Sequence, residues 1–188
     1  MKKPKKTLKS LNIDKSWTLF LDRDGIVNKL IVGGYVCKWK EFKFIPAFLK
    51  YIGRLSGKFG HIIIVTNQRC IAKRLVSKKG LALIHKKMVS AIKKRGGRVD
   101  RLYYCPHEIE DGCSCRKPKI GMLLKAKKAF KNIKFAKSVV IGDFESDMEF
   151  ARKAGMTGVL ISPKTAGIGG TKADYVYEGL EAFWKAIK

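Results

Sequence analysis

The chain has 188 residues, 46% of them hydrophobic, and its 41 Lys and Arg against 15 Asp and Glu give a formal net charge of +26. This length and apolar content suit one well-buried core and are too small for two independent domains. No run of about 18 apolar residues occurs, and no apolar stretch follows the lysine-rich start, which argues against a membrane span or a secretory signal. We therefore expect one cytoplasmic domain over residues 1–188, with residues 1–15 as a basic N-terminal tail.

The positive charge is spread from end to end instead of forming one stripe. Charge on this scale favours anionic and phosphorylated ligands in general, and a solvated lysine-rich surface accounts for most of it. The charge does not choose among these ligands; we expect no membrane partner and a monomer. Nucleic acid stays open as a less favoured partner.

Short apolar segments, rich in β-branched or aromatic residues and bounded by polar or Gly residues, predict buried strands at 17–22, 61–66, 101–105, 138–143 and 158–162. Longer segments with helical spacing lie between or after them, at 46–55, 78–94, 120–130, 146–154 and 177–187. This alternation predicts an α/β fold, a doubly wound parallel sheet in a three-layer α/β/α arrangement. Residues 162–173 are expected to form a surface loop.

Polar side chains follow three of the predicted strands at the point where each strand ends. Asp22 and Asp24 follow the first, Thr66 and Asn67 the second, and Asp143 the fourth. An Asp before Gly is also a common turn composition, but ligands of an open α/β sheet bind outside the carboxyl ends of its strands. Carboxylates that meet there, together with a phosphate oxygen, would suit Mg²⁺.

Four stretches resemble, in order, the four motifs of the haloacid dehalogenase (HAD) superfamily of phosphohydrolases. They are DRDG (22–25), VTNQ (65–68), CRKP (115–118) and VIGDFESD (140–147). The resemblance covers roughly residues 17–162 and implies an HAD-like fold without a large cap domain. It also implies that Asp22 is a nucleophile that forms an aspartyl-phosphate, and that Asp24 is the general acid and base.

The same resemblance assigns the groups that bind the phosphoryl oxygens. Thr66 and Asn67 would donate hydrogen bonds to those oxygens. Lys117 would offset the charge between Asp22 and the phosphate.

The resemblance also implies a magnesium site. Asp22, Asp143 and the backbone carbonyl of Asp24 would hold Mg²⁺. Asp147, one helical turn after Asp143, either supports that metal site or is an ordinary acidic residue at a helix N-terminus.

One short loop contains most of the cysteines. Cys105, His107, Cys113 and Cys115 fall within eleven residues, and three thiolates with an imidazole make a Cys₃His set that suits a closed structural zinc site. The cysteines do not resemble a secreted disulfide framework, because Cys113 and Cys115 are too close to bridge comfortably. We therefore expect a zinc-binding loop in a reducing compartment.

The stretch CPHEIEDGCSCRKPKIGML looks like the zinc-loop members of HAD subfamily IIIA, which include heptose bisphosphate and histidinol-phosphate phosphatases. GGYVCKWKEFKFIPAFLKYI favours the heptose branch. This implies Mg²⁺-dependent removal of the 7-phosphate of D-glycero-D-manno-heptose 1,7-bisphosphate. Gly34 and Tyr35 would lie near the sugar, and Arg116 would contact the phosphate that is not cleaved.

Other functions stay open at this point. The same motifs permit histidinol phosphate as the substrate, and the net charge permits a nucleic-acid 3′-phosphatase. A third alternative is a non-catalytic binding module on a degenerate phosphatase scaffold.

The chain departs from the family pattern at two places. Arg69, Cys70 and Arg74 stand where related sequences look Gly-rich, so a positive φ at any of them would require the loop to be rebuilt. Phe144 replaces a Lys of some heptose enzymes, which would remove a phosphate contact. Cys70 is expected to be a free thiol.

Overall fold

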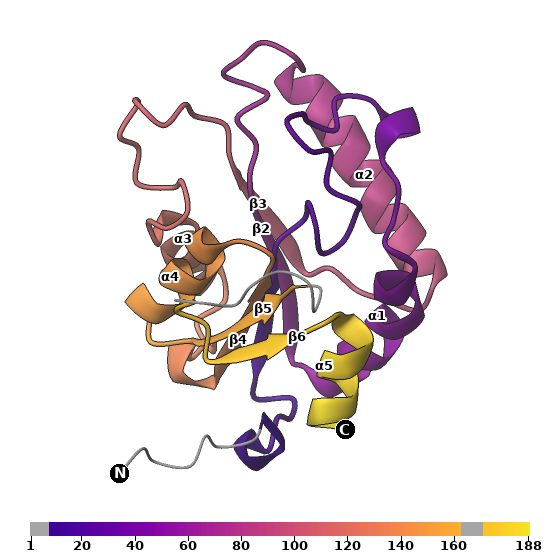
Figure 1. Ribbon diagram of the computed structural model, residues 1–188, viewed down its shortest axis with the longest axis vertical. Helices are drawn as coiled ribbons and strands as arrows, with labels where there is room; N and C mark the ends of the chain where they lie inside the picture. The colour runs from indigo at the N-terminus through magenta and orange to yellow at the C-terminus, as the bar shows by residue number, and fades with distance from the viewer. Residues whose placement is uncertain (1–7, 163–170) are drawn as a thin grey trace.

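The structure, a computed structural model, describes residues 8–162 and 171–188. At its centre lies a six-stranded parallel sheet in the order β3-β2-β1-β4-β5-β6 (Figure 1). The strands are β1 (Thr18–Leu21), β2 (His61–Asn67), β3 (Arg101–Cys105), β4 (Ser138–Gly142), β5 (Thr157–Ile161) and β6 (Tyr175–Tyr177).

Helices cover both faces of this sheet, which confirms the three-layer prediction (Figure 1). On one face, a single hydrophobic cluster includes side chains of α1 (Pro46–Lys58), α2 (Lys78–Lys94) and α5 (Leu180–Ile187). On the other face, a second cluster includes side chains of α3 (Gly121–Ala129) and α4 (Glu145–Lys153). Short 3₁₀ turns lie at η1 (Leu8–Leu11), η2 (Trp39–Glu41) and η3 (Phe135–Lys137).

The central strands are buried on both sides, as their continuous apolar runs predict. In β1, Leu19 and Leu21 belong to the first cluster, whereas Phe20 between them belongs to the second. This alternation is the ordinary consequence of the two-residue period of a strand. No cap domain occurs among residues 8–162 and 171–188, in agreement with the expectation.

The five expected strands are confirmed, but the sequence did not predict β6. The helix expected from Tyr177 begins at Leu180 instead, and Tyr175–Tyr177 form the edge strand. β6 has only three half-buried residues, too few to show a strand periodicity. Of the loop expected at 162–173, residues 163–170 lie outside the described residues.

The N-terminal segment differs from the expected tail. Residues 1–7 lie outside the described residues, and the apolar residues of the segment 8–15 pack on the domain. Leu8 is 1% exposed and Ile13 is 5% exposed, and both belong to the cluster that contains α1 and α5. The lysine-rich composition of this segment did not indicate that the apolar side chains of Leu8 and Ile13 would be buried.

The register of the sheet brings the strand ends to one edge. Leu21 pairs with Ile64 of β2 and with Ile141 of β4. The backbone N–H of Asp22 then donates to the carbonyl of Ile141 at 2.9 Å. The loops that follow β1, β2 and β3 all extend to this side of the molecule, the top of Figure 1.

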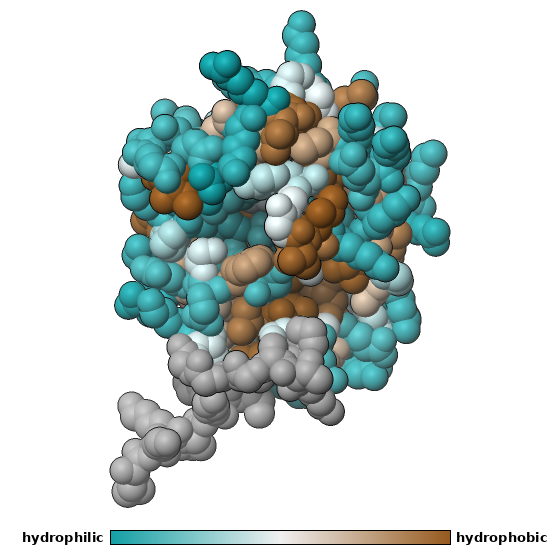
Figure 2. All heavy atoms as spheres, turned by 45° about the horizontal axis from the view of Figure 1, so that its top comes forward, coloured by the Kyte–Doolittle hydropathy of each residue, from teal (hydrophilic) through white to brown (hydrophobic). Residues whose placement is uncertain are grey.

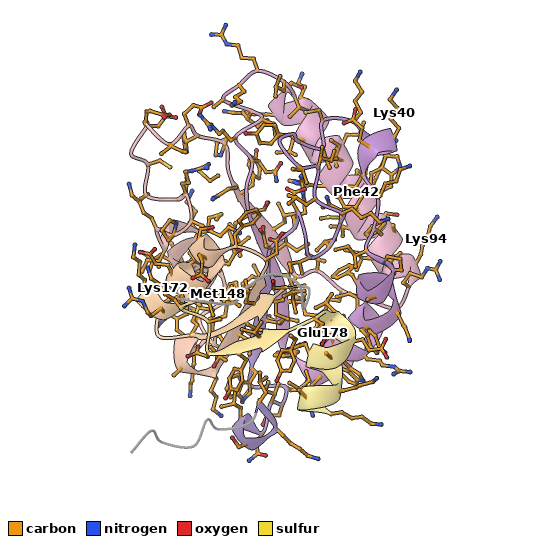
Figure 3. The ribbon with its side chains drawn as sticks, viewed as in Figure 1. Lys40, Phe42, Lys94, Met148, Lys172 and Glu178 are labelled. Atoms are coloured by element: carbon orange, nitrogen blue, oxygen red, sulfur yellow. The ribbon has the colours of Figure 1, made fainter. Side chains whose placement is uncertain are left out.

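The lysines lie mainly on the outside of the domain. Lys40 of η2 and Lys94 of α2, for example, point away from its body (Figure 3). Within the described part of the chain, no helix combines the length and the hydrophobicity needed to cross a membrane.

Candidate active site

A buried lysine joins two aspartates at the carboxyl edge of the sheet. Nζ of Lys117 lies 2.9 Å from Oδ1 of Asp22 and 2.5 Å from Oδ1 of Asp147, and it donates to the carbonyl of Val65 at 3.1 Å. Lys117 is 4% exposed. Since an ammonium group has three donors, these three acceptors fix its position.

The crowding of acids changes their proton affinity. Burial raises the pKa of Asp22 to about 7 despite the opposing charge of Lys117, and the carboxylates of Asp147 and Asp24 contribute to the rise. Burial, followed by the charges of Asp22 and Asp147, raises the pKa of Asp143 to about 8. With all of these acids ionised, the site would have more negative charge than its one lysine can neutralise, so a bound cation would favour their ionised forms.

The arrangement of oxygens fits a divalent metal ion. Carboxylate oxygens of Asp22, Asp143 and Asp147 lie within 4.8 Å of one another. Oδ1 of Asp143 is buried without a hydrogen-bond partner. Gly25, at φ +84°, lies so close that a Cβ there would be 1.8 Å from Oδ2 of Asp143, so only glycine fits. A hard cation with oxygen ligands, such as Mg²⁺, would satisfy the unpaired oxygen.

The carboxylate of Asp24 is held from three sides. Nη2 of Arg23 lies 2.8 Å from both of its oxygens, Nδ2 of Asn28 donates to Oδ1 at 2.9 Å, and Nε2 of Gln68 donates to Oδ2 at 2.9 Å. Burial alone would raise the pKa of Asp24, but the charge of Arg23 and these hydrogen bonds outweigh it and lower the pKa. Asp24 is therefore poised as a carboxylate when the pocket holds no ligand.

The end of β2 contributes two positioned side chains. Oγ1 of Thr66 accepts a hydrogen bond from Nε2 of Gln68 at 2.9 Å. Oδ1 of Asn67 accepts from the backbone N–H of Lys117 at 3.0 Å, and its Nδ2 donates to the carbonyl of Lys117 at 3.3 Å. Asn67 thus fixes the backbone that presents Lys117.

A pocket of about 310 Å³ lies over these groups. It is lined by all eight residues predicted for catalysis or substrate binding: Asp22, Asp24, Gly34, Tyr35, Thr66, Asn67, Arg116 and Lys117. Leu30 and Ile31, which the sequence did not suggest as lining residues, form an apolar wall with Phe144. Figure 2 shows hydrophobic side chains gathered beside hydrophilic ones on the face that includes this edge of the sheet.

The Cys/His loop forms a second cluster after β3. Sγ of Cys105 lies 3.5 Å from Sγ of Cys113 and 3.6 Å from Nδ1 of His107, and Sγ of Cys115 lies 3.5 Å from Sγ of Cys113 and 3.2 Å from Nδ1 of His107. Zn–S bonds of about 2.3 Å place the corners of a tetrahedron roughly 3.8 Å apart. The cysteines form no disulfide, so the four groups fit one tetrahedral zinc ion.

The comparisons with known proteins identify the family. A family model described as HAD-hydrolase-like matches residues 114–180. A D-glycero-α-D-manno-heptose-1,7-bisphosphate 7-phosphatase of Mycobacterium tuberculosis (strain ATCC 25618 / H37Rv) is 32% identical over 173 residues, which cover 91% of each chain. The chain belongs to the HAD superfamily of phosphatases. It is a phosphoric monoester hydrolase.

Two further relatives support this assignment to the HAD phosphatases. A D-glycero-β-D-manno-heptose-1,7-bisphosphate 7-phosphatase of Yersinia pestis is 36% identical over 181 residues, covering 90% of this chain and 94% of the relative. The crystal structure of the D,D-heptose 1,7-bisphosphate phosphatase from B. bronchiseptica, complexed with magnesium and phosphate, is 32% identical. It matches with a TM-score of 0.82 over 90% of this chain and 96% of that one.

The loop after β2 shows how this HAD phosphatase accommodates its unusual residues. Arg69 forms an ion pair with Glu108 of the Cys/His loop. Cys70 is fully buried, and its free thiol lies 3.5 Å from Oε1 of Gln68. Arg74 adopts a positive φ, of 57°, which places local strain on a residue other than glycine.

Sequence reasoning missed several groups that shape the site. Arg23, Asn28 and Gln68 hold Asp24, and each stands within or beside a motif that was already singled out. His85, in α2, hydrogen-bonds to Arg23 and had no motif that could identify it. Asp147, for which two roles stayed open, is bound directly to Lys117.

Proposed function

We propose that this enzyme hydrolyses the 7-phosphate of D-glycero-D-manno-heptose 1,7-bisphosphate through an aspartyl-phosphate on Asp22. The observation that carries this proposal is the pocket that contains Asp22 beside Lys117, with Asp24 two residues further on. The substrate is supported by relatives of that activity that match 90% or more of both chains at 32–36% identity.

In the first step, a carboxylate oxygen of Asp22 attacks phosphorus, and the bond between phosphorus and the C7 oxygen of the sugar breaks. Lys117, held by Asp22, Asp147 and Val65, neutralises charge on the phosphoryl group without having to reorganise. Asp24 gives its proton to the departing alkoxide. A bound phosphate dianion raises the pKa of Asp24, which favours its protonated form in the substrate complex.

In the second step, water attacks the phosphorus of the aspartyl-phosphate and Asp24 takes a proton from that water. The bond between phosphorus and Asp22 breaks, inorganic phosphate leaves and the carboxylate of Asp22 is restored. The lowered pKa of Asp24 in the ligand-free pocket suits its return to the ionised state after phosphate departs.

Mg²⁺ would be held by Asp22, Asp143 and the backbone carbonyl of Asp24. When bound it would neutralise negative charge on the phosphoryl oxygens and on the crowded carboxylates. Asp147 acts by positioning Lys117, to which it is bound at 2.5 Å.

The remainder of the pocket would bind the sugar and its second phosphate. Gly34 and Tyr35 line the pocket beside the apolar wall, where the carbon face of a sugar can pack. Arg116 lines both this pocket and an adjoining one of about 410 Å³ that also contains Lys119 and Lys153. This basic continuation of the pocket suits the phosphate that is not cleaved.

Substrate profiling tests the proposal. We expect a higher kcat/KM for heptose 1,7-bisphosphate than for fructose 1,6-bisphosphate, histidinol phosphate or a 3′-phosphorylated oligonucleotide. Preference for histidinol phosphate or for the oligonucleotide would overturn the assigned substrate. Asp22→Asn should reduce phosphate release on every substrate by a factor on the order of 10⁴ or more, because it removes the nucleophile. Phosphate release that persists in this variant would remove Asp22 from its role.

We also propose that Cys105, His107, Cys113 and Cys115 bind a structural zinc ion. Their four ligand atoms lie within 4.8 Å of one another, and four protein ligands leave no open position for catalysis. Lys119 donates to the carbonyl of Gly112 at 2.5 Å, so the loop also folds back on the segment that presents Arg116 and Lys117. Elemental analysis should find about one zinc per chain. A fully active protein without zinc would contradict this assignment.

A further inference from the structure

His85 is a buried titratable residue that the proposed chemistry does not use. It lies in the middle of α2 and is 7% exposed. Its Nε2 lies 3.1 Å from Nη1 of Arg23, and its ring packs on Tyr104 of β3 with the ring centroids 5.8 Å apart.

The hydrogen-bond partner of His85 is Arg23, which also binds the carboxylate of Asp24. Arg23 is 1% exposed; its Nη2 lies 2.8 Å from both oxygens of Asp24, and its Nε donates to Oδ1 at 3.3 Å. An arginine stays charged and can only donate, so Nε2 of His85 accepts the hydrogen bond and the ring proton resides on Nδ1. Burial and the charge of Arg23 lower the pKa of His85 to about 3, consistent with this neutral tautomer.

The guanidinium group transmits this contact to Asp24. It is a rigid plane, so its nitrogens cannot move independently. Without an acceptor at His85, Nη1 becomes a buried unpaired donor, which is unfavourable. Turning the plane to find another acceptor for Nη1 would move Nη2 and Nε away from Asp24.

We propose that His85 is a positioning residue that acts through Arg23 to hold the carboxylate of Asp24 for proton transfer to the leaving alkoxide. This inference rests on the proposed role of Asp24 as acid and base. If His85 only joined α2 to the sheet, its loss would lower stability but would not change which leaving groups the enzyme can expel.

Two substrates with different leaving groups separate these roles. Heptose 1,7-bisphosphate expels an alkoxide that needs a proton, whereas 4-nitrophenyl phosphate expels a phenolate that does not. We expect His85→Leu to lower kcat/KM for the heptose substrate by about 10-fold or more, and for 4-nitrophenyl phosphate by less than about 3-fold. His85→Gln, which can present an amide oxygen near the position of Nε2, should recover most of the loss.

Leu81→Ala is the matched control, because Leu81 is a fully buried core residue of the same helix. It should lower the melting temperature without discriminating between the two substrates. Equal losses on both substrates in His85→Leu, or equal behaviour of the Leu and Gln variants, would overturn the inference.

Asp24→Asn separates this inference from the proposed function. It should show the same leaving-group preference as His85→Leu, with a larger loss. If Asp24→Asn discriminates and His85→Leu does not, His85 has no positioning role and the proposed function stands. If Asp24→Asn does not discriminate, the acid role of Asp24 fails and the inference fails with it.

Discussion

The carboxylate site and the Cys/His loop lie close together and are built in opposite ways. The carboxylate site joins Asp22, Lys117 and Asp147, which are far apart in sequence and meet only because three strands end at one edge of the sheet. The Cys/His cluster comes from a single loop between Cys105 and Cys115. The first site thus depends on the whole fold, whereas the second can order its own segment once a metal binds.

The two clusters also differ in how their charge is balanced. In the carboxylate site, a protein cation, Lys117, already offsets part of the negative charge of the buried acids. In the described part of the chain, no lysine or arginine side chain hydrogen-bonds to the sulfurs of the Cys/His cluster, and burial raises the pKa of Cys105 to about 12. A metal ion would therefore stabilise the thiolates of the loop. At the carboxylate site, removal of Lys117 should destabilise the fold, because it leaves buried carboxylates without their cation.

Lys117→Met tests the dependence of the carboxylate site on its lysine. Methionine keeps most of the side-chain volume but leaves Asp22 and Asp147 without their buried partner, so we expect a loss of about 3–5 kcal/mol in the free energy of unfolding. Urea unfolding would measure this loss. The double variant with Asp147→Asn should recover part of it, since one unpaired carboxylate is then neutral. A single variant as stable as the native enzyme would mean that the ion pairs add nothing to stability.

Cys113→Ser tests the dependence of the loop on its metal. We expect loss of zinc and a decrease of about 3 kcal/mol in stability, or roughly 10 °C in melting temperature for a domain of this size. Cys37→Ser is the matched control, because Cys37 is a free, half-buried cysteine outside the cluster. It should keep its zinc and its melting temperature. Equal effects of the two substitutions would contradict a structural zinc site.

The same contrast explains what could be predicted from the sequence. The Cys/His cluster could be predicted because its four residues are close together in the sequence. The strand-end aspartates could be predicted because they follow apolar runs. The fold class followed from the alternation of strands and helices. The edge strand β6 was missed because its three residues show no periodicity.

Arg23 and Asn28 hold Asp24 from nearby in the sequence, but Gln68 and His85 support it through tertiary contacts that the sequence could not predict. His85 stands among lysines in α2, and its pairing with Arg23 exists only after α2 packs on the sheet. In the same way, the burial of Leu8 and Ile13 depends on the cluster that contains α1 and α5, which a lysine-rich segment does not reveal.

The buried His85 also makes the stability of the carboxylate region depend on pH. Burial and Arg23 lower its pKa from 6.5 to about 3. Below about pH 6.5 the unfolded chain binds a proton at this histidine, whereas the folded enzyme does not bind it until about pH 3. The contribution of His85 to stability is therefore present above pH 6.5 and is lost as the pH falls. At pH 5 this residue should contribute a loss of about 2 kcal/mol. Urea unfolding of native enzyme and His85→Gln at pH 7.5 and pH 5 would measure it; parallel losses would contradict the prediction.

The smallest expected effect concerns the loop after β2, which connects the two regions through the Arg69–Glu108 ion pair. Arg74 has a φ of 57°, where a side chain costs about 1 kcal/mol relative to glycine. Arg74→Gly and Arg74→Ala both remove the charge, but only glycine removes the strained Cβ. We therefore expect the Gly variant to be more stable than the Ala variant by about 1 kcal/mol in urea unfolding, a difference reduced by the greater freedom of glycine in the unfolded chain. If the Ala variant were as stable as the Gly variant or more stable, the loop would adopt this conformation without strain. The side chain at position 74 would then not lower the free energy of unfolding.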